Sequence, residues 1–97
     1  MVYTFRIMVH VHFTSALKRF VPDLQSIDAE GTTVADVITA VETAYPGLSD
    51  YLVEENGALR KHVHIFINDA FIRDRRKLSD GIRSGDHVHI IQALSGG

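Results

Sequence analysis

The chain has 97 residues, of which 45% are hydrophobic and 23% charged, and its formal net charge is −2. These values are typical of one globular domain with a modest core, and they exclude a disordered or fibrous chain. The small negative charge argues against general nucleic-acid binding, and no apolar run is long enough to span a membrane. There is no cysteine, so neither a disulfide nor a thiol nucleophile is available. No N-terminal leader is apparent, and we expect a cytoplasmic protein with neither a nucleic acid nor a membrane as partner.

The first predicted elements are two strands. Residues 2–13 alternate strictly between two faces, which is typical of a strand with one buried side. The inward set is Tyr3, Phe5, Ile7, Val9, Val11 and Phe13, and the outward set is Thr4, Arg6, Met8, His10 and His12. After a polar connection that contains Pro22, residues 24–30 form a weaker second strand, which ends at Gly31.

Residues 32–47 predict the helix. Thr33 and Asp36 have the spacing of a capping box, and Pro46 with Gly47 stops the helix. A single apolar stripe runs along it, formed by Val34, Val37, Ile38, Val41 and Tyr45. Residues 48–52 favour a short helical turn, and residues 56–57 (Asn-Gly) favour a tight turn.

The remaining elements are strands. Residues 62–68 predict a third strand, and residues 70–73 a short edge strand. Residues 83–86 have the composition of a turn, and residues 87–94 predict the last strand, with Val88 and Ile90 inward. The order ββαββ predicts an α+β fold, in which one main helix packs on one face of a mixed sheet.

Three segments match a known family pattern. TTVADVITAVETAYPGL has the form of the family's helix and following turn, and HIFINDAFIRD that of its third strand and turn. SGDHVHIIQALSGG matches the family's last strand and its terminal Gly-Gly. Together these segments resemble the MoaD/ThiS family of ubiquitin-like sulfur carrier proteins over nearly the whole chain. The chain is longer than most of the family's molybdopterin and thiamine carriers, and Gln92 stands where many relatives carry proline.

The resemblance implies a β-grasp (ubiquitin-like) domain over residues 1–91 and a flexible tail over residues 92–97 that ends in Gly-Gly. In the β-grasp fold the last strand lies parallel to the first strand in the middle of the sheet. The resemblance also implies a carrier and not an enzyme. A separate ubiquitin-activating-type enzyme would use ATP to adenylate the carboxylate of Gly97, and sulfur would then displace AMP to leave a thiocarboxylate. Gly96 and Gly97 lack side chains, so the tail could thread a narrow channel in that partner.

The implied partners are the adenylating enzyme, a sulfur donor and a downstream enzyme that accepts the sulfur. The chain itself is expected to bind no cofactor. The pathway stays open among cofactor, cysteine and tRNA-thiolation biosynthesis. Two alternatives within this class are a molybdopterin synthase small subunit and a ubiquitin-like protein modifier. The alternative from another class is a non-carrier module that binds a partner or a metal through its sheet.

All six histidines occur in three His-Val-His triplets. In each triplet the valine points to the core, so the histidines share the opposite, open face of the sheet. If the first, third and last strands are neighbours, this face gathers all six histidines and three apolar residues. Together with two residues of the tail, they form the predicted partner-binding surface: Met8, His10, His12, His62, His64, Phe66, His87, His89, Ile91, Gln92 and Leu94.

Three interpretations of this face stay open: an ordinary half-exposed strand surface, a partner-binding surface and a transition-metal site. Imidazoles suit zinc, copper or nickel. However, histidines two apart on one strand lie about 7 Å apart, which is wide for chelating one ion. We therefore predict that the chain has no metal site. If it does bind a metal ion, the six histidines are the only candidate ligands.

The basic run from Arg73 to Lys77 could steer an acidic partner, but we favour a solvated loop. No residue pattern in the chain indicates catalysis of its own.

Overall fold

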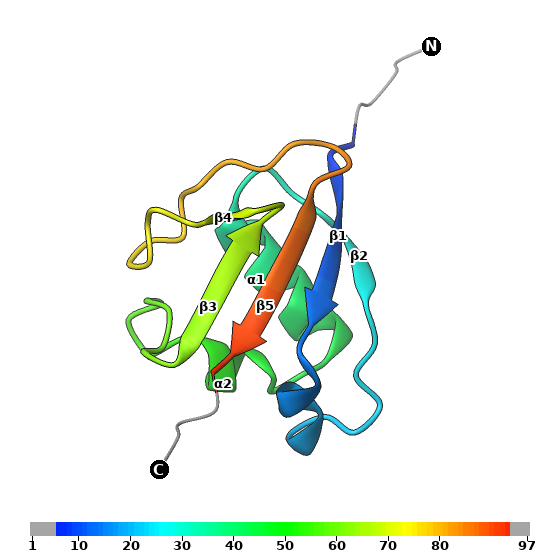
Figure 1. The fold of residues 1–97 in the computed structure, drawn as a ribbon, viewed down its shortest axis with the longest axis vertical. Coiled ribbons are helices and arrows are strands. Elements are labelled where there is room, and N and C mark those ends of the chain that lie inside the picture. Colours follow the sequence, from blue (N-terminus) through cyan, green and yellow to red (C-terminus); the bar gives the residue numbers. More distant parts are fainter. Residues whose placement is uncertain (1–5, 94–97) are drawn as a thin grey trace.

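The computed structural model describes residues 6–93. Three predicted site residues, Leu94, Gly96 and Gly97, lie outside the described residues, as do residues 2–5 of the predicted first strand. The elements follow the predicted order (Figure 1): β1 (Met8–Phe13), η1 (Ser15–Arg19), β2 (Ile27–Glu30), α1 (Val34–Ala44), α2 (Ser49–Leu52), β3 (Val63–Ile67), β4 (Ala70–Phe71) and β5 (His87–Gln92). The short 3-10 helix η1 is the one element here that the sequence did not predict. No helix within residues 6–93 is long and apolar enough to cross a membrane.

The strands form one mixed sheet in the order β2-β1-β5-β3-β4. β5 is parallel to β1 on one side and antiparallel to β3 on the other, so the last strand lies in the middle of the sheet, as predicted. In Figure 1 the helix α1 lies behind the sheet, and the opposite face carries no helix. We call this opposite side the open face.

The core lies between the sheet and α1. Each of the three central strands contributes its alternate residues, and these are fully buried, as Val11, Ile65 and Ile90 illustrate. From the helix the buried residues are Val34, Val37, Ile38 and Val41, which confirms the predicted apolar stripe; Tyr45 packs against the core only in part. Because the strand side chains alternate, the even-numbered residues of β1 and β3 and the odd-numbered residues of β5 point to the open face.

Hydrogen bonds from side chains to the backbone hold both ends of α1. Thr33 Oγ1 accepts from the Asp36 N–H at 3.4 Å, and Asp36 Oδ2 accepts from the Thr33 N–H at 3.2 Å. This is the predicted capping box. At the other end Glu42 accepts from the Gly47 N–H at 2.8 Å and from the Ser49 hydroxyl at 2.6 Å. The Ser49 hydroxyl and the backbone N–H groups hold the pKa of Glu42 below its usual value, so this carboxylate ties α1 to α2.

Candidate functional site

The end of β5 is hydrogen-bonded to its surroundings up to the last described residue. The Gln92 N–H donates to Thr14 Oγ1 at 3.2 Å, and the Ala93 N–H donates to the His62 carbonyl at 2.8 Å. β5 therefore includes Gln92, one residue beyond the predicted end of the folded domain at residue 91. The side-chain oxygen Oε1 of Gln92 is buried and has no hydrogen-bond partner among residues 6–93. These hydrogen bonds hold the backbone as far as Ala93, which is the second residue of the predicted C-terminal tail.

Four histidines gather on the open face, two from each of the parallel strands β1 and β5. His10 lies beside His87 in the register, and His12 lies beside His89. The ring centroids of His12 and His89 are 4.8 Å apart, and those of His10 and His87 are 5.0 Å apart. We call His10, His12, His87 and His89 the histidine quartet.

Hydrogen bonds link the quartet internally and to β2. His12 Nε2 lies 2.9 Å from His87 Nδ1, which is a hydrogen bond between two imidazoles. His10 Nδ1 lies 2.7 Å from Asp28 Oδ1, and His12 Nδ1 lies 3.2 Å from Ser26 Oγ. Sequence reasoning did not single out Asp28 or Ser26 as parts of the site. The signal that could have found them is the antiparallel pairing of β2 with β1, which places Asp28 opposite His10.

The electrostatics of the quartet favour the neutral form of His12. Burial lowers the pKa of His12 below its usual 6.5, and the three neighbouring histidines lower it further. A neutral ring keeps one nitrogen free to accept a hydrogen bond or to bind a cation. His12 can therefore both donate and accept a hydrogen bond within the quartet.

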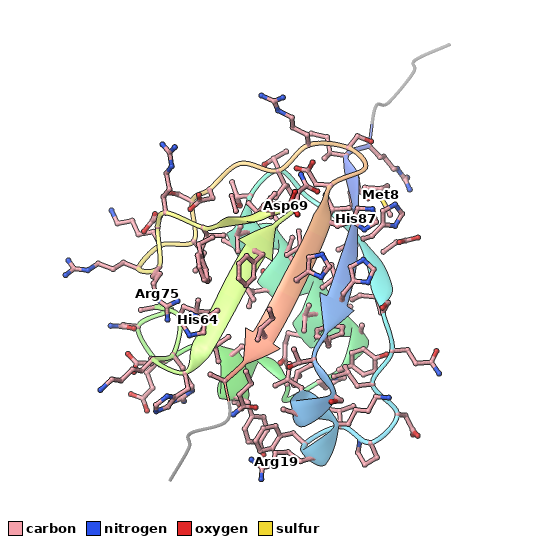
Figure 2. The ribbon with its side chains drawn as sticks, in the orientation of Figure 1. Met8, Arg19, His64, Asp69, Arg75 and His87 are labelled. Atoms are coloured by element: carbon pink, nitrogen blue, oxygen red, sulfur yellow. The ribbon has the colours of Figure 1, made fainter. Side chains whose placement is uncertain are left out.

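The other two histidines lie apart from the quartet. His64 is on β3, where it faces the Phe71 ring at 5.9 Å, and His62 is exposed in the turn before β3. In Figure 2 His64 lies next to Arg75, whereas His87 lies near Met8 toward the other end of the sheet. His64 still shares the open face with the quartet, as strand alternation predicts. The register separates it from the quartet, because β5 pairs His89 with Phe66 and pairs Ile91 with His64.

An apolar patch adjoins the quartet on the open face. Phe66 and Phe71 have ring centroids 4.1 Å apart, and Phe71 is 61% exposed. Met8, at the start of β1, is 38% exposed. Phe71 was not among the predicted surface residues, although its pairing with Phe66 across β3 and β4 places it on the same face. The open face thus combines imidazoles with exposed aromatic rings.

The basic run from Arg73 to Lys77 is an ordered loop. Asp74 accepts hydrogen bonds from the Ser79 hydroxyl and from the Lys77 N–H, the second at 3.0 Å. Arg75 donates to the carbonyl oxygens of Arg60 and Val63, each at 2.9 Å. At least one cation of the run therefore supports the fold, in keeping with the prediction of a structural loop.

Asp74 is expected to make the stability of the protein depend on pH in acid. The Ser79 hydroxyl, followed by the Lys77 backbone, lowers the pKa of Asp74 from 3.8 to about 2. A carboxyl group whose pKa is lower in the folded state stabilises the fold above its unfolded pKa, and this contribution is lost as pH falls from 3.8 toward 2. The Asp74→Asn variant should therefore be less stable than the wild-type protein at pH 7. As the pH falls through this range, the stability of the variant should decrease less than that of the wild type. Urea unfolding at each pH measures both effects.

The matched control is Asp69→Asn, which makes the same chemical change at an exposed turn residue. It should leave the acid dependence of the wild-type protein unchanged. An equal flattening of the pH dependence in both variants would contradict this role of Asp74.

A mixed sheet with its C-terminal strand in the middle and one helix across its back defines a ubiquitin-like protein of the β-grasp class. Residues 11–97 match the model of the ThiS family, and the chain belongs to this family. It is 33% identical over 91 residues to the sulfur carrier protein CysO of Mycobacterium tuberculosis, which covers 92% of this chain and 98% of CysO.

Solved structures agree with this assignment. A chain in the crystal structure of the BexX/CysO complex of Amycolatopsis orientalis is 29% identical, with a TM-score of 0.79 and coverage of 92% of this chain and 99% of that chain. SAMP1 of Haloferax volcanii shares the fold at 20% identity, with a TM-score of 0.77 over 93% of this chain and 99% of SAMP1. The predicted β-grasp fold and the prediction of a ubiquitin-like sulfur carrier are both confirmed, and the chain is a small carrier, not a catalyst.

Proposed function

We propose that the carboxylate of Gly97 carries the sulfur as a thiocarboxylate, after adenylation by a separate ATP-using enzyme. The observation that supports this most directly is the match to the ThiS family, which extends to residue 97 and so includes the terminal Gly-Gly. The N–H of Ala93, the last described residue, is hydrogen-bonded to the His62 carbonyl, and Gly97 follows four positions later. A short segment that ends in Gly96 and Gly97 has no bulky side chain to obstruct entry into a nucleotide site.

The chemistry requires two substitutions, neither of which needs a nucleophile in this chain. The Gly97 carboxylate attacks the α-phosphorus of ATP, and pyrophosphate leaves to give an acyl-adenylate. A hydrosulfide equivalent from a sulfur donor then attacks the acyl carbon, and AMP leaves with the electron pair of the broken C–O bond. The chain has no cysteine, so the sulfur must come from another protein or from free sulfide.

The partner-docking surface in this proposal is the open face together with the tail. The histidine quartet lies there next to the half-buried ring of Phe66 and the exposed ring of Phe71, and aromatic residues are enriched at protein interfaces. CysO of Amycolatopsis orientalis was crystallised as a complex with BexX. By analogy, we propose that this chain also docks onto the enzymes that activate it and that consume its sulfur.

Intact-mass measurement tests the proposal. The full chain is incubated with ATP, sulfide and a ubiquitin-activating-type adenylating enzyme from the same organism. We expect a gain equal to the mass difference between sulfur and oxygen, and we expect no gain when ATP is omitted. If neither the adenylate nor the thiocarboxylate forms, the proposed chemistry at Gly97 is wrong.

A further inference from the structure

The histidine quartet brings together two ring nitrogens from neighbouring strands. His12 Nε2 on β1 and His87 Nδ1 on β5 are 2.9 Å apart. In a tetrahedral zinc site with Zn–N bonds of about 2.0–2.1 Å, two ligand nitrogens lie about 3.3 Å apart. If the two nitrogens moved apart by a few tenths of an ångström and both rings turned so that their lone pairs converged, one ion could replace the hydrogen bond between them.

The objection that the sequence raised against a metal site does not apply to His12 and His87. The objection was that two histidines of one triplet lie about 7 Å apart along a strand. The close nitrogens belong instead to different triplets, which the parallel pairing of β1 with β5 brings side by side.

The second ring nitrogens of His10 and His12 are hydrogen-bonded to oxygen atoms, which is also common for histidines that bind a metal ion. Ligating histidines in proteins commonly donate the other ring N–H to a carboxylate or another oxygen, which fixes the ring and leaves one nitrogen free. His10 Nδ1 lies 2.7 Å from Asp28 Oδ1, and because a carboxylate only accepts, His10 Nδ1 carries the proton and its Nε2 is free. His12 Nδ1 has Ser26 Oγ at 3.2 Å in the same position.

There is space for an ion and its water ligands in front of these nitrogens. An open hollow of about 250 Å³ is lined by His10, His12, Ser26, Ile27, Asp28 and His87. Within residues 6–93 no set of three or more His, Asp or Glu side chains already stands in a ligand arrangement. Only the pair of nitrogens from His12 and His87 is therefore already close together. The ring centroid of His10 is 5.0 Å from that of His87, and His10 must rotate to supply a third nitrogen.

We propose that the histidine quartet binds a divalent transition metal ion that prefers imidazole, such as Zn²⁺, through His12 Nε2, His87 Nδ1 and His10 Nε2. Asp28 orients His10 from behind as a positioning residue. Water completes the coordination, as in zinc sites that have three protein ligands. The site is independent of the Gly97 chemistry, because it uses only side chains of β1, β2 and β5.

Calorimetric titration of ZnCl₂ into the tag-free full chain tests the site. We expect saturable binding with one ion per chain at micromolar concentration. His12→Gln and His87→Gln should each weaken binding at least about 10-fold, and Asp28→Asn about 10-fold. His62→Gln is the matched control, since it removes an exposed histidine outside the quartet, and its affinity should equal that of the wild type.

Either of two calorimetric results would overturn the proposal. One is the absence of saturable heat with the wild-type chain, and the other is an equal loss of affinity in His62→Gln and His87→Gln. Circular dichroism checks that each variant is folded. In the wild-type chain, NMR spectra of the imidazole nitrogens give a second measurement, in which Zn²⁺ should shift the signals of His10, His12 and His87 and leave His62 unchanged. Shifts at His62 alone would also disprove the site.

Discussion

Replacing Ile90 by alanine is expected to lower the free energy of unfolding by about 2–5 kcal/mol, the usual cost of truncating a fully buried isoleucine. Ile90 is 0% exposed and lies on β5, the central strand that pairs with both β1 and β3. A domain of this size is stable by only about 5–15 kcal/mol. One deleted side chain would therefore remove a large part of the stability. Urea unfolding followed by circular dichroism measures the change.

The neighbouring isoleucine supplies the matched control. Ile91 is on the same strand, but it points to the open face and is only half-buried. Ile91→Ala removes the same atoms, and we expect it to cost clearly less stability. In contrast, Ile91→Ala should weaken docking of a partner on the open face, whereas Ile90→Ala should act through stability alone. Equal losses of stability in the two variants would contradict the assignment of Ile90 to the core and Ile91 to the surface.

The fold was predictable from local patterns because each pattern has a direct physical cause. Strict alternation predicted the inward residues of β1 and β5, and the pairing of Thr33 with Asp36 predicted the start of α1. The 3-10 helix η1 was missed because residues 15–19 have no helical apolar stripe and no side-chain cap at Thr14. Its formation depends on Leu17, which is fully buried in the core that the rest of the chain forms.

The site was predictable only in part, because it depends on register between strands that are far apart in the sequence. Alternation assigned each histidine to the correct face, but it could not show which triplets lie side by side. The parallel pairing of β1 with β5 joins His12 to both His87 and His89. The antiparallel pairing of β3 instead places Phe66, and not a histidine, beside His89. A single sequence does not carry this offset, so it could not show that four of the histidines on the open face would form the quartet.

Deleting Gly97 is expected to abolish adenylation and thiocarboxylate formation while leaving the free energy of unfolding unchanged. The reaction that we propose takes place at the carboxylate of this residue, and removing one residue shortens an extended tail by about 3.3–3.6 Å. An in-line attack requires the reacting atoms to lie within about 3–3.5 Å of each other, and a misplacement of only about 1 Å can already slow it about 100-fold. The shortened tail would therefore hold its carboxylate too far from the α-phosphorus of ATP. The buried core extends from Val9 to Ile90, so it is unaffected by the deletion. ATP–pyrophosphate exchange and intact mass measure the chemistry, and urea unfolding measures the stability.

Two further variants separate the position of the carboxylate from the need for a bare backbone. Gly97→Ala keeps the length of the tail and adds one methyl group, so it should retain part of the exchange rate. Gly96→Val keeps the terminal glycine but adds a branched side chain next to it, and it should lose more activity than Gly97→Ala because the side chain would obstruct a narrow channel. If the chain without Gly97 were adenylated at the wild-type rate, the terminal carboxylate of Gly96 would serve equally well. The proposed dependence on tail length would then be wrong.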